Sequence, residues 1–160
     1  MADGKSHGRI TLALTITMTP IVTIITLSPQ KSVMFSTGCL LGLIVEPDLD
    51  VNHVTESERR MIKVFGTLAY FWIGLWLPYA LIIPHRSILS HMPILGTAIR
   101  LAYLLGWLYL LLGALGMQDW LFTVIQANLE ALVWLVLGLV IVDTGHWIAD
   151  WKMFSRIWRE

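Results

Sequence analysis

Residues 64–83 read VFGTLAYFWIGLWLPYALII, a run of 20 residues without a charged side chain. A helix needs about 20 apolar residues to cross the hydrocarbon core of a membrane, so this segment is long enough to span. Gly66, Gly74 and Pro78 interrupt it, however, and it is rich in aromatic rings, which favour the membrane–water boundary. Two arrangements of the chain follow. The segment either crosses the membrane, or lies at the interface or re-enters on one face.

The composition of the whole chain predicts a membrane protein. Of its 160 residues, 56% are hydrophobic and 14% are charged, and the mean hydropathy is +0.70. A soluble globular domain usually carries about 25% charged residues, so we expect lipid to cover part of this surface. The length suits a single domain, and the formal net charge of zero gives no field that would favour nucleic acid.

The other apolar segments predict four membrane-spanning helices, at about residues 10–27, 32–45, 93–117 and 120–142. The first carries a threonine at every fourth position from Thr11 to Thr23, and we expect that stripe to face other helices. The second carries Gly38 and Gly42, a spacing of small residues that lets helices approach closely.

The positions of the basic residues favour four spans over five. With four spans, nearly every Lys and Arg falls on the side of the N-terminus, Arg100 can extend to that side, and only Lys31 lies opposite. With five spans the basic residues divide evenly. We therefore predict an all-α polytopic membrane bundle with both termini cytoplasmic, an interfacial or re-entrant segment at 64–83, and an interfacial C-terminal helix.

Histidines and aspartates gather at the ends of the predicted spans. They are His7 before the first span, Asp48 and Asp50 after the second, His85 and His91 before the third, and Asp143, His146 and Asp150 after the fourth. Counting the spans between these groups puts all of them on one membrane face, provided that residues 64–83 do not cross. Imidazole and carboxylate ligands suit zinc, manganese or iron better than calcium, and more than four candidate ligands leave room for two metals.

Simpler interpretations of each group remain open. On a continuous helix, Asp143, His146 and Asp150 would project from one face, where a His and a carboxylate four residues apart can chelate a divalent cation. Alone, the same three residues could form a polar helix end, and Asp48 and Asp50 could form a turn after proline. We interpret His53 as an interfacial histidine outside the site.

Three motifs carry a resemblance to a known family. Residues 4–7 read GKSH, 47–50 read PDLD and 85–93 read HRSILSHMP. Together they resemble a bacterial and cyanobacterial family of uncharacterised metal-binding membrane proteins. They are more distantly similar to inner-membrane proteins described as metal-dependent hydrolases, which share a late His-x-x-x-Asp element. The resemblance implies a metal site made of His7, Asp48, Asp50, His85, His91, His146 and Asp150. It suits a bacterial inner membrane or a thylakoid membrane.

The first functional hypothesis is a metal-dependent hydrolase, a phosphoesterase acting on a lipid or another substrate near the membrane. A bound metal, zinc before manganese or iron, would activate water and polarise a phosphoryl oxygen. Arg86 and Lys5 are next to predicted ligands and are the candidates to hold phosphate charge. Ser87 and Ser90 would orient ligands rather than attack.

The second hypothesis is a non-catalytic, metal-stabilised subunit of a larger membrane complex. Its basis is an apolar stripe on the C-terminal helix, made of Trp147, Trp151, Phe154 and Trp158. Glu130 is also expected near mid-membrane, where an ionised group needs a partner, either Arg100 or another protein. A transporter is less favoured, because the ligands gather at an edge rather than at the midplane.

Overall fold

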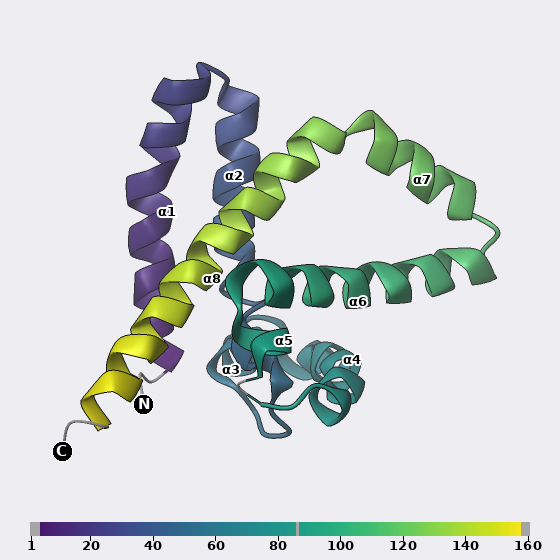
Figure 1. Ribbon diagram of the computed structural model, residues 1–160. Coiled ribbons are helices and arrows are strands. Elements are labelled where there is room, and N and C mark those ends of the chain that lie inside the picture. The colour runs from purple at the N-terminus through teal and green to yellow at the C-terminus, as the bar shows by residue number, and fades with distance from the viewer. Residues whose placement is uncertain (1–3, 86, 158–160) are drawn as a thin grey trace.

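The computed structural model describes residues 4–85 and 87–157, with side chains described for 6–85 and 87–150. Helices are the only regular structure in these ranges, which agrees with the predicted all-α class (Figure 1). They are α1 (Gly4–Thr26), α2 (Pro29–Leu41), η1 (Pro47–Asp50), α3 (Glu56–Phe65), η2 (Gly66–Leu68), α4 (Ala69–Ile82), α5 (Ile88–His91), α6 (Pro93–Ala114), α7 (Gln118–Ala127) and α8 (Leu129–Ile157).

Helices α1, α2 and α8 pack against one another, and the closest approach is between α2 and α8 (Figure 1). A Cβ atom on Gly38 would lie 1.9 Å from the Leu135 carbonyl oxygen, and one on Gly138 would lie 2.1 Å from that of Phe35. No residue other than glycine fits at either position without moving a backbone. The predicted close contact at Gly38 is therefore present, and α8 supplies the matching glycine.

The threonine stripe of α1 faces other helices only over its first half. Thr11 and Thr15 are buried, and the Thr15 hydroxyl donates to the Thr11 carbonyl at 2.8 Å. Thr23 is exposed and donates to the Thr19 carbonyl within its own helix. The stripe is thus used near the end of α1 that carries His7.

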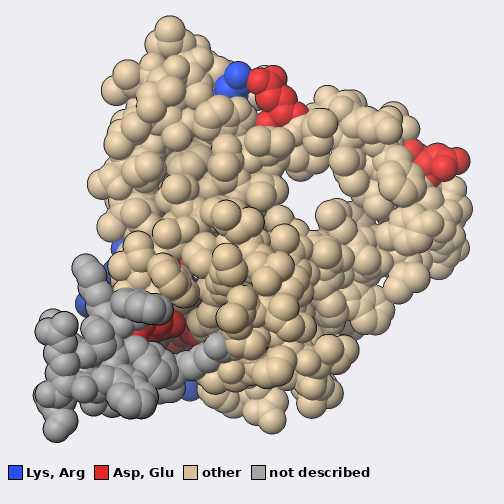
Figure 2. Space-filling model, in the orientation of Figure 1, with Lys and Arg blue, Asp and Glu red and all other residues tan. Residues whose placement is uncertain are grey.

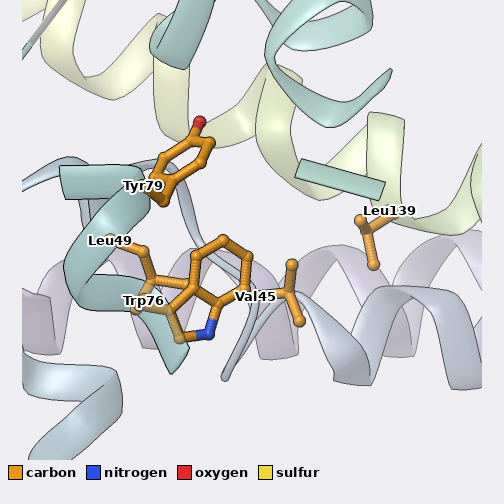
Figure 3. Packing of buried hydrophobic residues seen from close by; sticks show 5 residues of the cluster. All are labelled: Val45, Leu49, Trp76, Tyr79 and Leu139. Atoms are coloured by element: carbon orange, nitrogen blue, oxygen red, sulfur yellow. The ribbon is translucent and has the colours of Figure 1, made fainter. Parts of the chain in front are cut away.

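The aromatic segment 64–83 does not form one straight helix. Gly66, with φ of 57°, ends α3, and α4 then packs back toward η1. Trp76 and Tyr79 of α4 are buried with Val45 and Leu49 in a small aromatic core (Figure 3). Asp50 before α3 and His85 after α4 are then joined by a hydrogen bond of 2.7 Å. The stretch from Asp50 to His85, which contains α3 and α4, therefore begins and ends at the same place in the molecule.

Within the described residues, four helical stretches are long and apolar enough to cross a membrane: Ser6–Thr26, Glu56–Ile82, Pro93–Ala114 and Leu129–Asp150. Two boundaries differ from those predicted. The segment 32–45 contains the end of α2, which has 13 residues and a length of about 20 Å, too short to cross alone. The segment 120–142 is divided between α7 and α8, because Asn128 departs from helical geometry and its side chain donates to the Val124 carbonyl.

The break at Asn128 also corrects two expectations about charged residues. Glu130 lies in the first turn of α8 rather than in its middle, is 74% exposed, and pairs with Lys31 at 2.7 Å. It does not pair with Arg100. Arg100 is completely buried, so it does not extend to the surface as expected, and its partner is Asp143.

The second half of α6 and the whole of α7, residues 105–127, project from the bundle, and we call them the α6–α7 arm. Helix α6 starts beside α8 and runs away from α1 and α2, crosswise to their direction, and α7 returns to α8 (Figure 1). The space-filling view shows an opening framed by this part of the molecule (Figure 2). Apolar side chains are exposed on the arm, among them Leu110, Leu111 and Leu115 at 62–64%.

Candidate metal centre

The fold brings together side chains from widely separated parts of the sequence at one end of the α1–α2–α8 bundle. The first turns of α1 supply His7, and the short helix η1 supplies Asp48 and Asp50. The loop before α5 supplies His85, α5 ends at His91, and the second half of α8 supplies His146 and Asp150. Pro47 starts η1 and fixes the turn that presents both aspartates.

Asp150 lies between two histidines. Its Oδ1 is 3.3 Å from His7 Nε2, and its Oδ2 is 3.4 Å from His146 Nε2. The two imidazole rings stack nearly parallel, with centroids 3.6 Å apart. His7 and His146 are both buried, so α1 and α8 meet through these rings.

The two aspartates of η1 extend the cluster toward α5. Asp48 Oδ1 lies 3.4 Å from His91 Nε2 and 3.7 Å from His146 Nε2. Asp50 uses its Oδ1 to bond His85 Nδ1, and its Oδ2 lies 3.5 Å from His91 Nδ1. The seven residues predicted as ligands therefore form one continuous cluster.

The cluster fits a metal ion. Two triads, His7–His146–Asp150 and Asp48–His91–His146, each place their ligand atoms within 4.8 Å of one another, and His146 belongs to both. Two ligands each about 2.1 Å from a tetrahedral ion are about 3.4 Å apart, close to the observed N···O separations. The buried Nε2 atoms of His91 and His146 have no hydrogen-bond partner among the described residues, which suits nitrogens placed for a metal.

The surroundings of η1 favour the ionised form of Asp48, which is the form that binds a metal. Burial disfavours its ionised form, but the adjacent imidazoles of His146 and His91 outweigh burial and hold the pKa of Asp48 well below its usual range. Its neighbour Glu46 behaves differently. Glu46 is buried and accepts the Ser57 N–H at 3.1 Å, and burial raises its pKa. The sequence did not single out Glu46 as part of this region.

A buried network holds His91 in place. Ser90 Oγ is hydrogen-bonded to His91 Nδ1 at 2.9 Å, in keeping with the orienting role predicted for that serine. Arg100 Nη1 donates to the Ser90 carbonyl at 2.9 Å, and Arg100 also binds Asp143. Thr97 donates to the same carboxylate. The sequence analysis placed Asp143 with the candidate ligands. In the structure it binds Arg100, which in turn holds the Ser90 carbonyl next to His91.

Sequence reasoning missed the supporting roles of Thr97 and Arg100. The sequence did offer a signal for this role, namely Arg100 itself, because an ionisable residue inside an apolar helix usually has a buried partner. Gly96 completes this contact, because a Cβ there would lie 2.3 Å from the Ser90 carbonyl oxygen. Helices α5 and α6 are therefore joined closely at the position that sets the orientation of His91.

Some predicted residues cannot be placed in the site. Arg86 lies outside the described residues, and Lys5 is described only by its backbone at the start of α1. The side chains of Trp151, Phe154 and Trp158 are likewise outside the described set. His53 is exposed and is not part of the cluster.

Replacing Ser90 by alanine should weaken metal binding without unfolding the protein. The substitution removes the hydroxyl that fixes the His91 ring, and loss of such an outer contact typically costs about 10–100-fold in metal affinity. Competition with a metal-chelating dye would measure the change. Ser36→Ala is the matched control, because the Ser36 hydroxyl donates to the Val33 carbonyl within α2 and is remote in sequence from every candidate ligand. Equal affinities of wild type and Ser90→Ala would contradict the orienting role.

The fold and cluster define an all-helical protein, over the described residues, with a histidine–aspartate group able to hold a metal. Comparison with known families then places it. The chain belongs to the family described as uncharacterized metal-binding protein (DUF2227), which it matches over residues 2–159. Comparisons with curated proteins and with solved structures found no match.

Proposed function

We propose that the chain is an integral membrane protein whose metal centre lies at the cytoplasmic face of a bacterial inner membrane or thylakoid. Its support is the exposed apolar surface. Ile16 of α1 and Phe71 of α4 are 71% and 82% exposed, and the face in Figure 2 carries few charged side chains. Because Asp50 before α3 and His85 after α4 are hydrogen-bonded to each other, α3 and α4 would form a re-entrant or interfacial hairpin. The positive-inside distribution supplies the cytoplasmic assignment.

We further propose that the family's metal is held here where the Nε2 atoms of His7, His91 and His146 approach Asp48 and Asp150. Imidazole and carboxylate donors suit zinc first, with manganese or iron as alternatives. Asp50 and His85 adjoin this position and could hold a second ion. Elemental analysis of the purified protein would give both the identity and the number of metals.

The reaction that this arrangement supports best is hydrolysis of a phosphoester near the membrane surface. A bound metal would lower the pKa of a water toward about 7 and polarise a phosphoryl oxygen. The observation that carries the proposal is a pocket of about 400 Å³ lined by Asp50, His85 and the segments 51–53 and 80–84. His85 is 38% exposed and is oriented by the buried Asp50, so it can exchange a proton with a molecule in the pocket.

A direct assay tests the hydrolytic proposal. Metal-loaded wild type should release 4-nitrophenol from bis(4-nitrophenyl) phosphate or 4-nitrophenyl phosphate. His91→Ala should abolish this turnover while the helical circular dichroism signal is retained. Glu130→Ala is the control and should keep full activity, since its side chain is 74% exposed, pairs with Lys31 and does not line the pocket beside His85. Retained turnover in His91→Ala would reject the proposal, as would an inactive wild type that contains metal.

The α6–α7 arm favours a second candidate, a metal-stabilised subunit of a larger membrane complex. Its exposed leucines and the opening beside it leave apolar surface that a partner's helices could cover (Figure 2). Lipid could cover the same surface, and mild solubilisation followed by sizing separates the two. A stable stoichiometric partner would favour the subunit, and a lone active monomer would favour the hydrolase.

A further inference from the structure

A separate pocket of about 380 Å³ lies where α1, α3 and the turn after α2 meet. Its lining residues are Gly8, Arg9, Leu12, Leu43, Glu56 and Arg60. None of them belongs to the histidine–aspartate cluster. The pocket combines two arginines with apolar side chains, which is the chemistry expected of a site for an amphiphilic anion.

The guanidinium of Arg60 is fixed in position inside this pocket. Its Nη1 donates to the Leu43 carbonyl at 3.3 Å. It also lies against the backbone of α1, because a Cβ on Gly8 would be only 2.4 Å from Arg60 Nη2. Glycine at position 8 therefore leaves the room that the guanidinium occupies. A guanidinium held in this way loses little further freedom when it binds a ligand.

Among the described residues that line the pocket, two are basic, Arg9 and Arg60, and one is acidic, Glu56. The Glu56 Oε2 also approaches Arg59 Nη1 at 3.9 Å. Guanidinium groups bind phosphate oxygens through paired N–H donors. The shared chemistry of the ligand is therefore a phosphate monoester or diester.

An apolar track leaves the pocket along α1. Gly8, Leu12 and Ile16 are four residues apart and lie on one side of the helix. Leu12 is 45% exposed and Ile16 is 71% exposed, so the track is open to the surroundings. A ligand with a phosphate head and a long apolar chain would match both parts, which free phosphate would not.

We propose that this pocket binds the headgroup of an anionic phospholipid, with an acyl chain lying along Leu12 and Ile16. The inference rests on the proposed membrane placement of α1, but it requires neither bound metal nor hydrolysis. Basic groups at the cytoplasmic end of a spanning helix are attracted to anionic lipids, and here a shaped pocket adds selectivity.

Native mass spectrometry of the full-length protein would test the proposal. The protein would be released from nanodiscs of equal parts phosphatidylglycerol and phosphatidylcholine. Wild type should retain phosphatidylglycerol in preference to phosphatidylcholine. Arg60→Gln and Arg9→Gln should each lower that retention about tenfold, the loss expected for one charge-assisted hydrogen bond. Arg59→Gln is the matched control and should leave it unchanged, since Arg59 is 65% exposed and does not line the pocket.

Other outcomes would overturn the inference. Equal retention of the two lipids by wild type would do so, as would an equal loss in Arg59→Gln. Complete displacement of phosphatidylglycerol by excess inorganic phosphate would also reject the proposal, because it would show that the pocket binds phosphate and that the acyl chain adds no affinity. If Arg60→Gln fails to fold, Arg9→Gln decides alone, because Arg9 is exposed. Recovery of wild type in the soluble fraction of cells would reject the membrane placement, while metal content would still report on the metal centre.

Discussion

Replacing His146 by alanine should reduce bound metal to background. His146 belongs to both candidate triads, and its buried Nε2 lies within 3.7 Å of both Asp48 and Asp150. Loss of this one ring leaves neither triad complete, whereas loss of His7 or His91 would leave one. The expected effect is therefore the largest of any single ligand substitution.

Elemental analysis of purified wild type and His146→Ala would measure this effect. His53→Ala should retain the wild-type metal content, which controls for the loss of a histidine from the chain. Thermal unfolding would show whether His146→Ala is still folded before its metal content is compared. A metal-free wild type, or unchanged metal in His146→Ala, would contradict the metal centre as we describe it.

Replacing Asp143 by alanine should destabilise the protein by about 3–5 kcal/mol, because it leaves the fully buried guanidinium of Arg100 without its counter-charge. Thr97 loses its acceptor in the same change. Metal affinity should fall as well, since Arg100 also holds the Ser90 carbonyl beside His91. Denaturant titration in detergent, followed by tryptophan fluorescence, would measure the stability.

Two variants calibrate this prediction. Glu130→Ala removes a carboxylate from the same helix, but its pair with Lys31 is exposed and should contribute no more than about 1 kcal/mol. A double variant with Arg100→Met and Asp143→Leu removes both charges and should recover much of the lost stability. If Asp143→Ala and Glu130→Ala cost the same, the buried pair does not stabilise the fold as proposed.

The gathering of the cluster could be predicted from sequence because it depends on order along the chain. Counting the predicted spans between His7, Asp48, His85 and His146 places them on one face, once residues 64–83 are taken to return. The sequence of 64–83 itself favours a returning segment, because Gly66 and the aromatic residues disfavour a simple membrane crossing. In the structure, Asp50 and His85, which lie before α3 and after α4, are hydrogen-bonded to each other, and whether 64–83 crosses a membrane stays a prediction.

The supporting contacts could not be predicted in the same way. Hydropathy alone predicted one span over 120–142. In the structure the helix breaks at Asn128, and Glu130 therefore lies at the start of α8. The pairing of Arg100 with Asp143 depends on how α6 crosses α8, and periodicity within either helix does not encode that crossing. Helix α2 was expected to span by composition, and its length is visible only once the turn at Gly42 is known.

The stacked rings of His7 and His146 join the first turns of the first helix to the last helix of the described chain. The site therefore cannot form until α8 has been synthesised, and a metal bound there would join α1 to α8. Closing so long a loop late has an entropic cost, which the metal–ligand bonds would offset. Metal occupancy would then distinguish chains that include α8 from chains that stop before it.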